Sequence, residues 1–314
     1  MNPSFTPHSA APAPQARVRR LRRVQLAVPA SNEKMMAKAA ASAADHVFLD
    51  LEDAVSLNAK ADARAKAVHA LNTLDWGRKT RCVRINDWTT PYFLDDVLQI
   101  VEGARENLDV LMIPKVMNAA DVYVVDVLLT QLETKHSIRK RIGIEVLIEE
   151  VEGLKNVEQI ASSSPRLEAL IFGMGDYSAS QGIDMELARG YYPGDVWHYP
   201  RFRIAMAARC AGIAAVDGPY GDIANIAGYQ NQCKLAFTLG MVGKWALHPT
   251  QIEPALDVFT PKQKDIDNTR AMMAAYSEAQ ERGVGAIMFN GAFIDVAVVR
   301  RAQNLLARAE LLGM

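Results

Sequence analysis

Eight short apolar runs, separated by longer segments of helical period, restrict the fold of this chain more than any other feature. Each run is four to seven residues long, and several are apolar at consecutive positions, which is typical of strands buried on both faces of a parallel sheet. The runs are residues 24–28, 46–51, 82–85, 110–113, 142–148, 169–172, 213–216 and 242–247. The helical segments between them are residues 32–44, 61–71, 94–101, 119–132, 157–161, 201–211, 223–239 and 252–259.

Eight strand–helix repeats predict an α/β fold, a closed (β/α)₈ or TIM barrel, over residues 21–260. An open doubly wound sheet is the competing architecture. That fold normally has fewer strands, and no GxGxxG motif follows the first run here. Residues 261–314 predict a C-terminal helical lid or oligomer contact, with a helix over 261–283, a strand or loop over 284–294 and a helix over 295–312.

The first twenty residues differ in composition from the rest. Pro, Ala and Ser dominate residues 3–15, and no apolar segment resembles the core of a secretion signal. We interpret residues 1–20 as a disordered arm whose basic cluster lies in solvent. The cluster comprises Arg17, Arg19, Arg20, Arg22 and Arg23.

Composition excludes several classes of partner. No apolar run approaches the ~20 residues that a membrane span needs, and no basic and aromatic cluster suggests nucleic acid. Cys82, Cys210 and Cys233 are scattered, which argues against a disulfide framework and a zinc site. A cytoplasmic location is expected.

Polar residues interrupt the chain where the predicted strands end. In a TIM barrel the C-terminal ends of the strands carry the active site. Several of these groups are carboxylates, which need cations when buried, and a hard divalent ion, Mg²⁺ or Mn²⁺, suits oxygen ligands better than Zn²⁺ does. The strand-end residues are Asp50, Glu52, Asp53, Arg84, Asn86, Lys115, Glu149, Asp176, Asp217 and His248.

Simpler explanations exist for some of these residues. Asp217 precedes Gly-Pro and equally fits a helix N-cap. Lys115 is also consistent with an isolated surface lysine, and His248 with a structural histidine. Ser31 is expected to cap the helix over residues 32–44, and Cys82 is expected to be a small core residue.

Nine segments in the same order resemble the HpcH/HpaI aldolase and citrate lyase beta-subunit superfamily, and within it the malyl-CoA and β-methylmalyl-CoA lyases. The resemblance covers residue 21 to the C-terminus. The segments are QLAVPASN (25–32), FLDLEDAV (48–55), VRIN (83–86), MIPKV (112–116), EVLIEEVEGL (145–154), FGMGDYSAS (172–180), VDGPYGD (216–222), GKWALHPTQI (243–252) and FIDVAVVRRA (293–302).

The resemblance implies a catalytic role for several residues. Glu149 and Asp176 match the family's metal-binding carboxylates, and Arg84 matches the arginine that contacts the thioester or enolate oxygen. Glu52 and Asp53 match acidic residues that hold metal-bound waters and the arginine.

The resemblance also implies binding roles. Lys115 and His248, with Ser31 and Asn32 of the first loop, match the region that holds coenzyme A. Backbone N–H groups at Gly175, Asp176 and Tyr177 are expected to bind the carboxylate of a 2-oxo acid. Asp295 matches a lid aspartate that reaches the active site of a neighbouring subunit, which implies a homo-oligomer, a trimer or hexamer.

The implied activity is that of an Mg²⁺-dependent CoA-ester lyase, with Mn²⁺ as a possible replacement. It would cleave a 3-hydroxyacyl-CoA such as L-malyl-CoA or β-methylmalyl-CoA to acetyl-CoA or propionyl-CoA and glyoxylate. Residues 181–198 are shorter than in malyl-CoA lyases and hold Tyr191, Tyr192, Trp197 and His198, which leaves pyruvate open as the product of a citramalyl-CoA lyase. The resemblance is also compatible with a malyl-CoA thioesterase and with a citrate lyase beta-type subunit.

Overall fold

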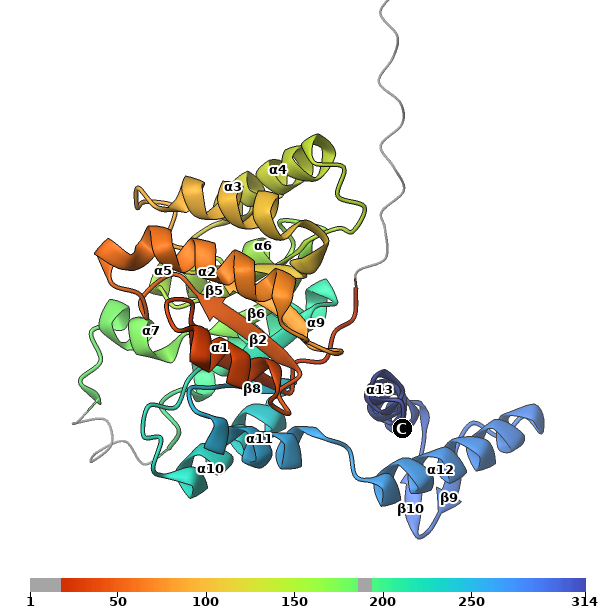
Figure 1. Ribbon diagram of the computed structural model, residues 1–314. Helices are drawn as coiled ribbons and strands as arrows, with labels where there is room; N and C mark the ends of the chain where they lie inside the picture. The colour runs from red at the N-terminus through yellow and green to blue at the C-terminus, as the bar shows by residue number, and fades with distance from the viewer. Residues whose placement is uncertain (1–17, 186–193) are drawn as a thin grey trace, which may run out of the picture.

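Eight parallel strands close into a barrel in the computed structural model, which describes residues 18–185 and 194–314. The strands follow one another in sequence order around the barrel, and the last pairs with the first. The predicted (β/α)₈ barrel with a C-terminal extension is therefore confirmed (Figure 1). The strands are β1 (Val24–Pro29), β2 (His46–Asp50), β3 (Thr80–Arg84), β4 (Val110–Ile113), β5 (Gly143–Ile148), β6 (Leu167–Phe172), β7 (Ala214–Asp217) and β8 (Gly243–Ala246).

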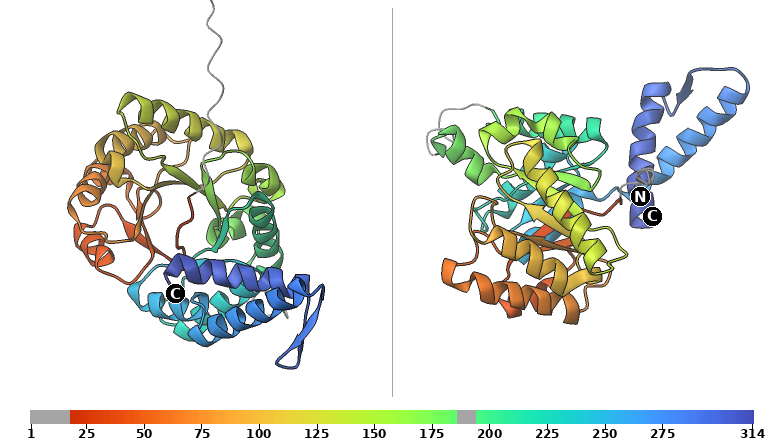
Figure 2. Two further views of the ribbon diagram at one scale, coloured as in Figure 1. Left: turned by 90° about the vertical axis from the view of Figure 1, so that its right-hand side faces the viewer. Right: turned by 90° about the horizontal axis from the view of Figure 1, so that it is seen from above.

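Helices cover the outside of the barrel, as the view along its axis in Figure 2 shows. They are α1 (Glu33–Ala40), α2 (Lys60–Thr73), α3 (Phe93–Ala104), α4 (Ala119–Lys135), α5 (Val151–Lys155), α6 (Val157–Ala161), α7 (Met174–Gln181), α9 (His198–Ala211), α10 (Ile226–Thr238) and α11 (Ile252–Phe259). Three 3₁₀ turns accompany them in the described residues, η1 (Leu57–Ala59), η2 (Arg105–Asn107) and η3 (Pro249–Gln251).

The first helix corrects one prediction about its capping residue. Asn32, and not Ser31, is the N-cap of α1, because its side-chain oxygen accepts a hydrogen bond from the N–H of Met35 at 3.1 Å. The helix also ends at Ala40, four residues before the predicted end at residue 44.

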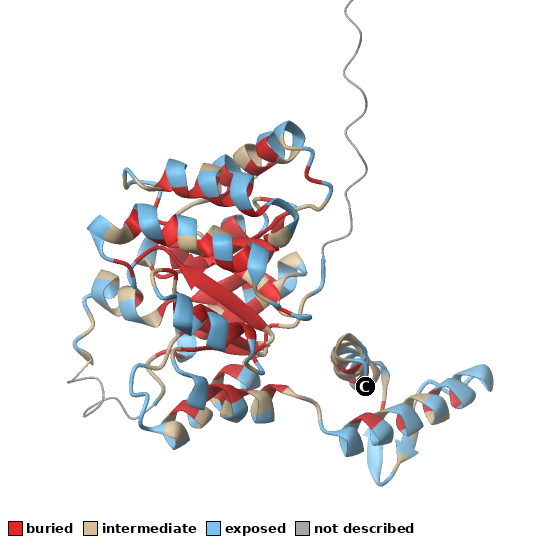
Figure 3. Ribbon diagram, viewed as in Figure 1, coloured by how far each residue is buried: buried red, intermediate tan, exposed pale blue. Residues whose placement is uncertain are grey.

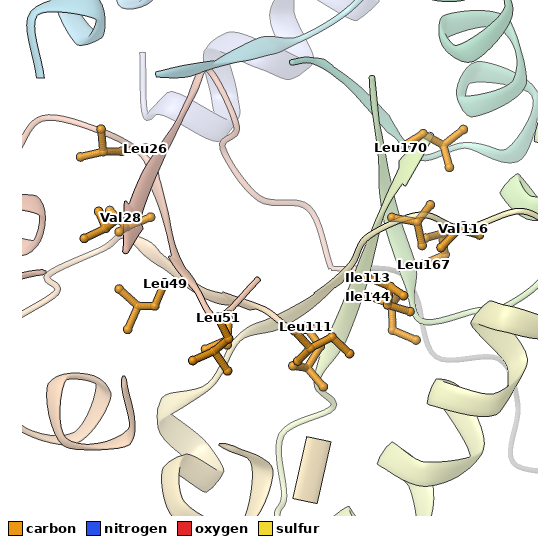
Figure 4. Close-up of a cluster of buried hydrophobic side chains, with 14 of the residues drawn as sticks. Leu26, Val28, Leu49, Leu51, Leu111, Ile113, Val116, Ile144, Leu167 and Leu170 are labelled. Carbon is orange, nitrogen blue, oxygen red and sulfur yellow. The ribbon is translucent and has the colours of Figure 1, made fainter. Parts of the chain in front are cut away.

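Two apolar layers hold the barrel together. The outer layer lies between strands and helices, and most residues of the barrel strands are buried (Figure 3). Successive side chains of a strand point to opposite faces, so the alternate residues fill the barrel interior. The interior layer is Phe48, Cys82, Val110, Met112, Leu147, Ile171, Val216 and Trp245. Outer-layer residues labelled in Figure 4 are Leu26, Val28, Leu49, Leu51, Leu111, Ile113, Val116, Ile144, Leu167 and Leu170.

A buried ion-pair cluster closes the end of the barrel at which the strands begin. The Nε of Arg22 donates to Glu145 Oε1 at 2.6 Å, and its Nη2 donates to Glu168 Oε2 at 2.5 Å. His46 Nε2 lies 3.3 Å from Glu145 Oε1. Burial alone would raise the pKa of Glu145, but His46 and Arg22 outweigh it, and the net shift is downward.

This cluster corrects the interpretation of the basic N-terminal cluster as solvated. Arg20 and Arg22 both pair with Glu168, and Arg23 pairs with Asp45 at 2.7 Å. A Cβ on Gly243 would lie 1.6 Å from the carbonyl oxygen of Arg22, so glycine is needed where this segment crosses the start of β8. Residues 1–17, the greater part of the predicted arm with Arg17, lie outside the described residues.

The C-terminal segment forms a separate small unit beside the barrel. It contains α12 (Gln263–Glu281), the antiparallel hairpin β9 (Ile287–Phe289) and β10 (Ala292–Ile294), and α13 (Val296–Leu312). Both views in Figure 2 place this unit at the end where the strands begin, opposite α7. Among the described residues, no helix combines the length and apolar character needed to cross a membrane.

The Arg22 cluster generates a stability prediction. Arg22→Met leaves Glu145 and Glu168 without this cation in a buried site, so we expect the free energy of unfolding to fall by about 3–5 kcal/mol. The exposed Arg19 is a matched control. Arg19→Met should change the free energy of unfolding by about 0.5 kcal/mol or less. Urea unfolding at fixed protein concentration measures both; equal losses would contradict the assignment.

Candidate active site

Glu149 lies at the C-terminal end of the barrel, directly after β5, and is 1% exposed. One carboxylate oxygen, Oε1, accepts a hydrogen bond from the backbone N–H of Lys115 at 2.8 Å. The other oxygen lies against Gly173, where a Cβ would approach to 2.3 Å. Glycine at the junction of β6 and α7 is therefore what admits this carboxylate.

Three neighbouring groups determine the charge environment of Glu149. Burial raises the pKa of its carboxyl well above the ordinary value, and the negative charges of Glu52 and Asp176 raise it further. The guanidinium of Arg84 opposes this effect but does not reverse it. The arrangement favours an added cation, because a buried carboxylate facing two others is otherwise costly to ionise.

Arg84 is the central cation of the site and is held by two carboxylates. Its Nε and Nη2 each donate to Asp50 at 2.7 Å, in a bidentate pair, and its Nη1 lies 2.8 Å from Glu52 Oε2. Two of its five N–H groups are used in the hydrogen bonds to Asp50, and three remain for Glu52 and a ligand. The predicted contact between Glu52 and Arg84 is present, whereas Asp53 is exposed and contacts Lys115 at 3.7 Å.

Asp50 is a site residue whose strand-end position was evident in the sequence but whose role was not. A period-two argument identifies it, because Phe48, Asp50 and Glu52 are separated by two positions and the first of these lies in the barrel interior. Asp50 also accepts hydrogen bonds from the N–H groups of Glu52 at 2.9 Å and Ala54 at 3.2 Å. It therefore positions both Arg84 and the loop that carries Glu52.

Lys60 is a second site residue, and sequence reasoning missed it. Its buried ammonium group donates to the carbonyl oxygens of Leu51 and Glu52 and to Asn86 Oδ1, each at 2.7 Å. Burial lowers the pKa of Lys60, although nearby Asp50 and Asp96 oppose the shift. No local sequence signal distinguishes this lysine, because its partners come from other elements.

Lys115 links the acidic groups through both its backbone and its side chain. Its ammonium group is ion-paired with Glu52, and its φ of 51° is in the left-handed region that few non-glycine residues adopt. This conformation accompanies the hydrogen bond from its N–H to Glu149. Lys115 is thus part of the acidic site and not an isolated surface lysine.

Asp176 reaches the site from the first turn of α7. The predicted Gly173–Tyr177 turn is the start of this helix, and the N–H groups before Tyr177 precede its first internal hydrogen bond. Tyr177 itself corrects the prediction: its N–H donates to Gly173 O at 3.0 Å and its hydroxyl donates to Gln181 at 2.9 Å. Gly175 is exposed and stays a predicted anion contact.

The aromatic and histidine residues of segment 181–198 lie in different environments. Trp197 is buried and packs edge-on against Phe172 at 5.7 Å, so it supports the base of α7. His198 is exposed and stacks on Phe202 with ring centroids 6.4 Å apart. Tyr191 and Tyr192 lie outside the described residues.

Asp217 is a strand-end carboxylate that lies outside the candidate site. It points outward between the barrel and its helices, where it accepts hydrogen bonds from Arg201 Nε at 2.9 Å and Lys244 Nζ at 2.5 Å. The prediction that it lies on the shared rim, or caps a helix, is wrong, because its charge is satisfied by these two buried cations.

The predicted coenzyme A contacts are polar groups on the surface of the barrel. His248 is exposed and caps η3, its Nδ1 lying 2.9 Å from Thr250 Oγ1. Asn32 is exposed, and Ser31 is half-buried, at the start of α1. These positions leave the coenzyme A contacts as predictions.

Asp295 does not lie at the active site of its own chain. It is the N-cap of α13, and its Oδ1 accepts hydrogen bonds from Ala297 at 2.9 Å and Val298 at 3.0 Å. The C-terminal unit that carries it lies at the opposite end of the barrel from α7 (Figure 2).

The residues present fit a divalent metal ion. Asp50, Glu52, Glu149 and Asp176 supply four carboxylates against the cations of Arg84 and Lys115. Glu149 and Asp176, from adjacent strand ends, are the oxygen donors that these cations do not pair with directly. Mg²⁺ is commonly held by one or two carboxylates with the remaining positions open to water and substrate.

Comparison with known proteins agrees with this geometry. The chain is 43% identical to the L-malyl-CoA/beta-methylmalyl-CoA lyase of Cereibacter sphaeroides, covering 96% of this chain and 98% of the relative. It is 33% identical to the malyl-CoA/beta-methylmalyl-CoA/citramalyl-CoA lyase of Chloroflexus aurantiacus, covering 84% and 80%.

A solved structure is similar over nearly the whole chain. The protein CitE from Mycobacterium tuberculosis, in complex with magnesium, acetoacetate and coenzyme A, superposes with a TM-score of 0.71 at 30% identity, covering 91% of this chain and 97% of that one. The HpcH/HpaI aldolase/citrate lyase family model matches residues 23–249. The chain belongs to the HpcH/HpaI aldolase/citrate lyase family and is a lyase.

Proposed function

We propose that this protein is an Mg²⁺-dependent CoA-ester lyase that cleaves L-malyl-CoA or β-methylmalyl-CoA to acetyl-CoA or propionyl-CoA and glyoxylate. The observation that carries the proposal is that Glu149, buried at the C-terminal end of β5, interacts electrostatically with both Asp176 and Arg84. The relatives with malyl-CoA lyase activity in their names support the substrate class.

The proposed reaction breaks the bond between the thioester α-carbon and the carbon that bears the hydroxyl. The hydroxyl gives its proton to water, its carbon becomes the 2-oxo group, and the electrons of the broken C–C bond pass to the thioester as an enolate. When bound by Glu149 and Asp176, Mg²⁺ supplies a Lewis acid for the hydroxyl and carboxylate of the substrate.

The residues of the chain have distinct tasks in this proposal. The N–H groups of Arg84 that are free of Asp50 and Glu52 stabilise the enolate oxygen. Asp50 and Glu52 hold the guanidinium in place while that charge develops. Asp295 of a neighbouring subunit gives a proton to the enolate carbon, and the position of α13, which Asp295 caps, at the opposite end of the barrel from α7 supports this trans arrangement (Figure 2).

The metal assignment predicts the effect of neutralising either carboxylate. Glu149→Gln or Asp176→Asn should weaken Mn²⁺ binding, measured by titration calorimetry or electron paramagnetic resonance, by more than about 100-fold, because outer-shell changes alone cost 10–100-fold. Metal-dependent cleavage should be lost in parallel. Glu150→Gln changes the adjacent, half-buried residue and should leave both unchanged; unaltered Mn²⁺ affinity in the first two variants would refute the assignment.

The reaction assignment predicts a product pattern. Incubation of the protein with L-malyl-CoA and Mg²⁺ should release acetyl-CoA and glyoxylate, identified by mass spectrometry. Malate with free coenzyme A would instead indicate a thioesterase. Condensation of acetyl-CoA or propionyl-CoA with glyoxylate, compared with pyruvate, would identify the 2-oxo acid, and a strong preference for pyruvate would favour a citramalyl-CoA lyase.

The trans role of Asp295 predicts complementation between inactive chains. Arg84→Ala and Asp295→Ala should each be inactive, but after subunit exchange at equal concentrations about one quarter of the sites in a cyclic oligomer combine an intact Arg84 with a partner's intact Asp295. Cleavage activity should return to that fraction of the wild-type value. Mixing Asp295→Ala with the Arg84→Ala/Asp295→Ala double variant is the control. Full activity of Asp295→Ala alone would exclude the role.

A further inference from the structure

Two aromatic rings lie beneath the guanidinium of Arg84. The Arg84 Cζ is 5.5 Å from the centroid of the Trp245 ring and 5.9 Å from that of Phe48. The two rings are 4.4 Å apart and tilted by 41°, and both residues lie in the interior layer of the barrel. Both distances are within the ~6 Å at which a cation is attracted by an aromatic face.

A chain of hydrogen bonds links Trp245 to the end of the barrel at which the strands begin and determines the orientation of its ring. Its Nε1 donates to Gln25 Oε1 at 2.7 Å, and Gln25 Nε2 donates to Glu145 Oε2 at 2.8 Å. Glu145 is held in turn by Arg22 at 2.6 Å. All of these groups are buried, so the ion-pair cluster at one end of the barrel is connected through Trp245 to the catalytic end.

An aromatic support has a chemical advantage at this position. Arg84 already donates two hydrogen bonds to Asp50 and is ion-paired with Glu52, and a further hydrogen-bond acceptor beneath it would occupy the N–H groups that a substrate oxygen needs. A ring face attracts the cation without accepting a directed N–H bond. It therefore limits the movement of the guanidinium while leaving those donors available.

We propose that Trp245 is a positioning residue for the lyase reaction, acting through Arg84 by means of its ring face and its hydrogen bond to Gln25. This inference rests on the proposed role of Arg84 at the enolate oxygen. The hydrogen bond and ring contacts of Trp245 in the described residues go to Gln25, Arg84 and Phe48, so its effect is expected on the chemical step and not on metal binding.

The test compares Trp245→Leu with Trp245→Phe in the cleavage of L-malyl-CoA. Loss of the ring face should lower kcat about tenfold, which corresponds to ~1.4 kcal/mol and lies within the range of a desolvated cation–π contact. KM and Mn²⁺ affinity should stay within about twofold of wild type, because uniform binding is unchanged. Trp245→Phe retains a ring and should recover most of the lost kcat.

Trp76 provides the control for loss of a buried indole. It is as buried as Trp245, at 4% exposure, and its Nε1 donates to Ala70 O at 3.1 Å on the outer side of the barrel. Trp76→Leu should lower stability without changing kcat. Phe48→Leu removes the other ring but keeps the bond between Gln25 and Trp245, and it should lower kcat about threefold. If Trp245→Leu does not fold, the kcat of Phe48→Leu tests the role of the ring faces in its place.

Each contrary outcome has a separate meaning. Unchanged kcat in Trp245→Leu or in Phe48→Leu, an equal loss in Trp76→Leu, or a parallel loss of Mn²⁺ affinity would overturn the positioning role. Wild-type kcat in Arg84→Lys would instead overturn the proposed function of Arg84. Impaired Arg84→Lys with normal Trp245→Leu would leave the proposed function intact and reject only the inference.

Discussion

The catalytic end of the barrel depends on the pairing of the Arg84 guanidinium with buried carboxylates. The guanidinium pairs with Asp50 through two hydrogen bonds and with Glu52 through a third contact, and its charge opposes the raised pKa of Glu149. Without it, several carboxylates would share a buried region with little compensation, which costs several kcal/mol for an unpaired charge. Lys115 adds a second cation through its ion pair with Glu52, and Glu149 and Asp176 are left as the carboxylates available to a divalent ion.

The two ends of the barrel use buried charge in opposite ways. At the end where the strands begin, Arg22 pairs with both Glu145 and Glu168, so each of these two carboxylates has a buried cation of the protein as its partner. At the other end the carboxylates exceed the cations, so the protein alone leaves a site for a metal and an anionic substrate. This division agrees with the general separation of stability and catalysis between the two faces of a TIM barrel. Trp245 and Gln25 join the two networks through the interior.

The position of the C-terminal unit is the reason that our proposal places Asp295 in the site of a neighbouring subunit. Asp295 caps α13 at the end of the barrel opposite α7, so its carboxylate cannot act in its own site in this arrangement. In the proposed reaction, the proton donor therefore comes from a neighbouring subunit. The short hairpin β9–β10 exposes Met288 and Phe293, which gives the unit apolar surface for such a contact.

The sequence by itself determined the repeating architecture and a set of candidate site residues. Consecutive apolar positions specify buried parallel strands, whereas position at the strand ends made Glu149 and Arg84 two of several polar candidates, and the resemblance to the family selected them. Only the tertiary structure decided that Arg22 is a buried partner of Glu145, that Asp217 faces Arg201 and Lys244, and that Asp50 holds Arg84. The physical reason is that pairing of buried charges depends on which elements meet across the barrel, and residues more than a hundred positions apart, such as Arg22 and Glu145, leave no local pattern in the chain.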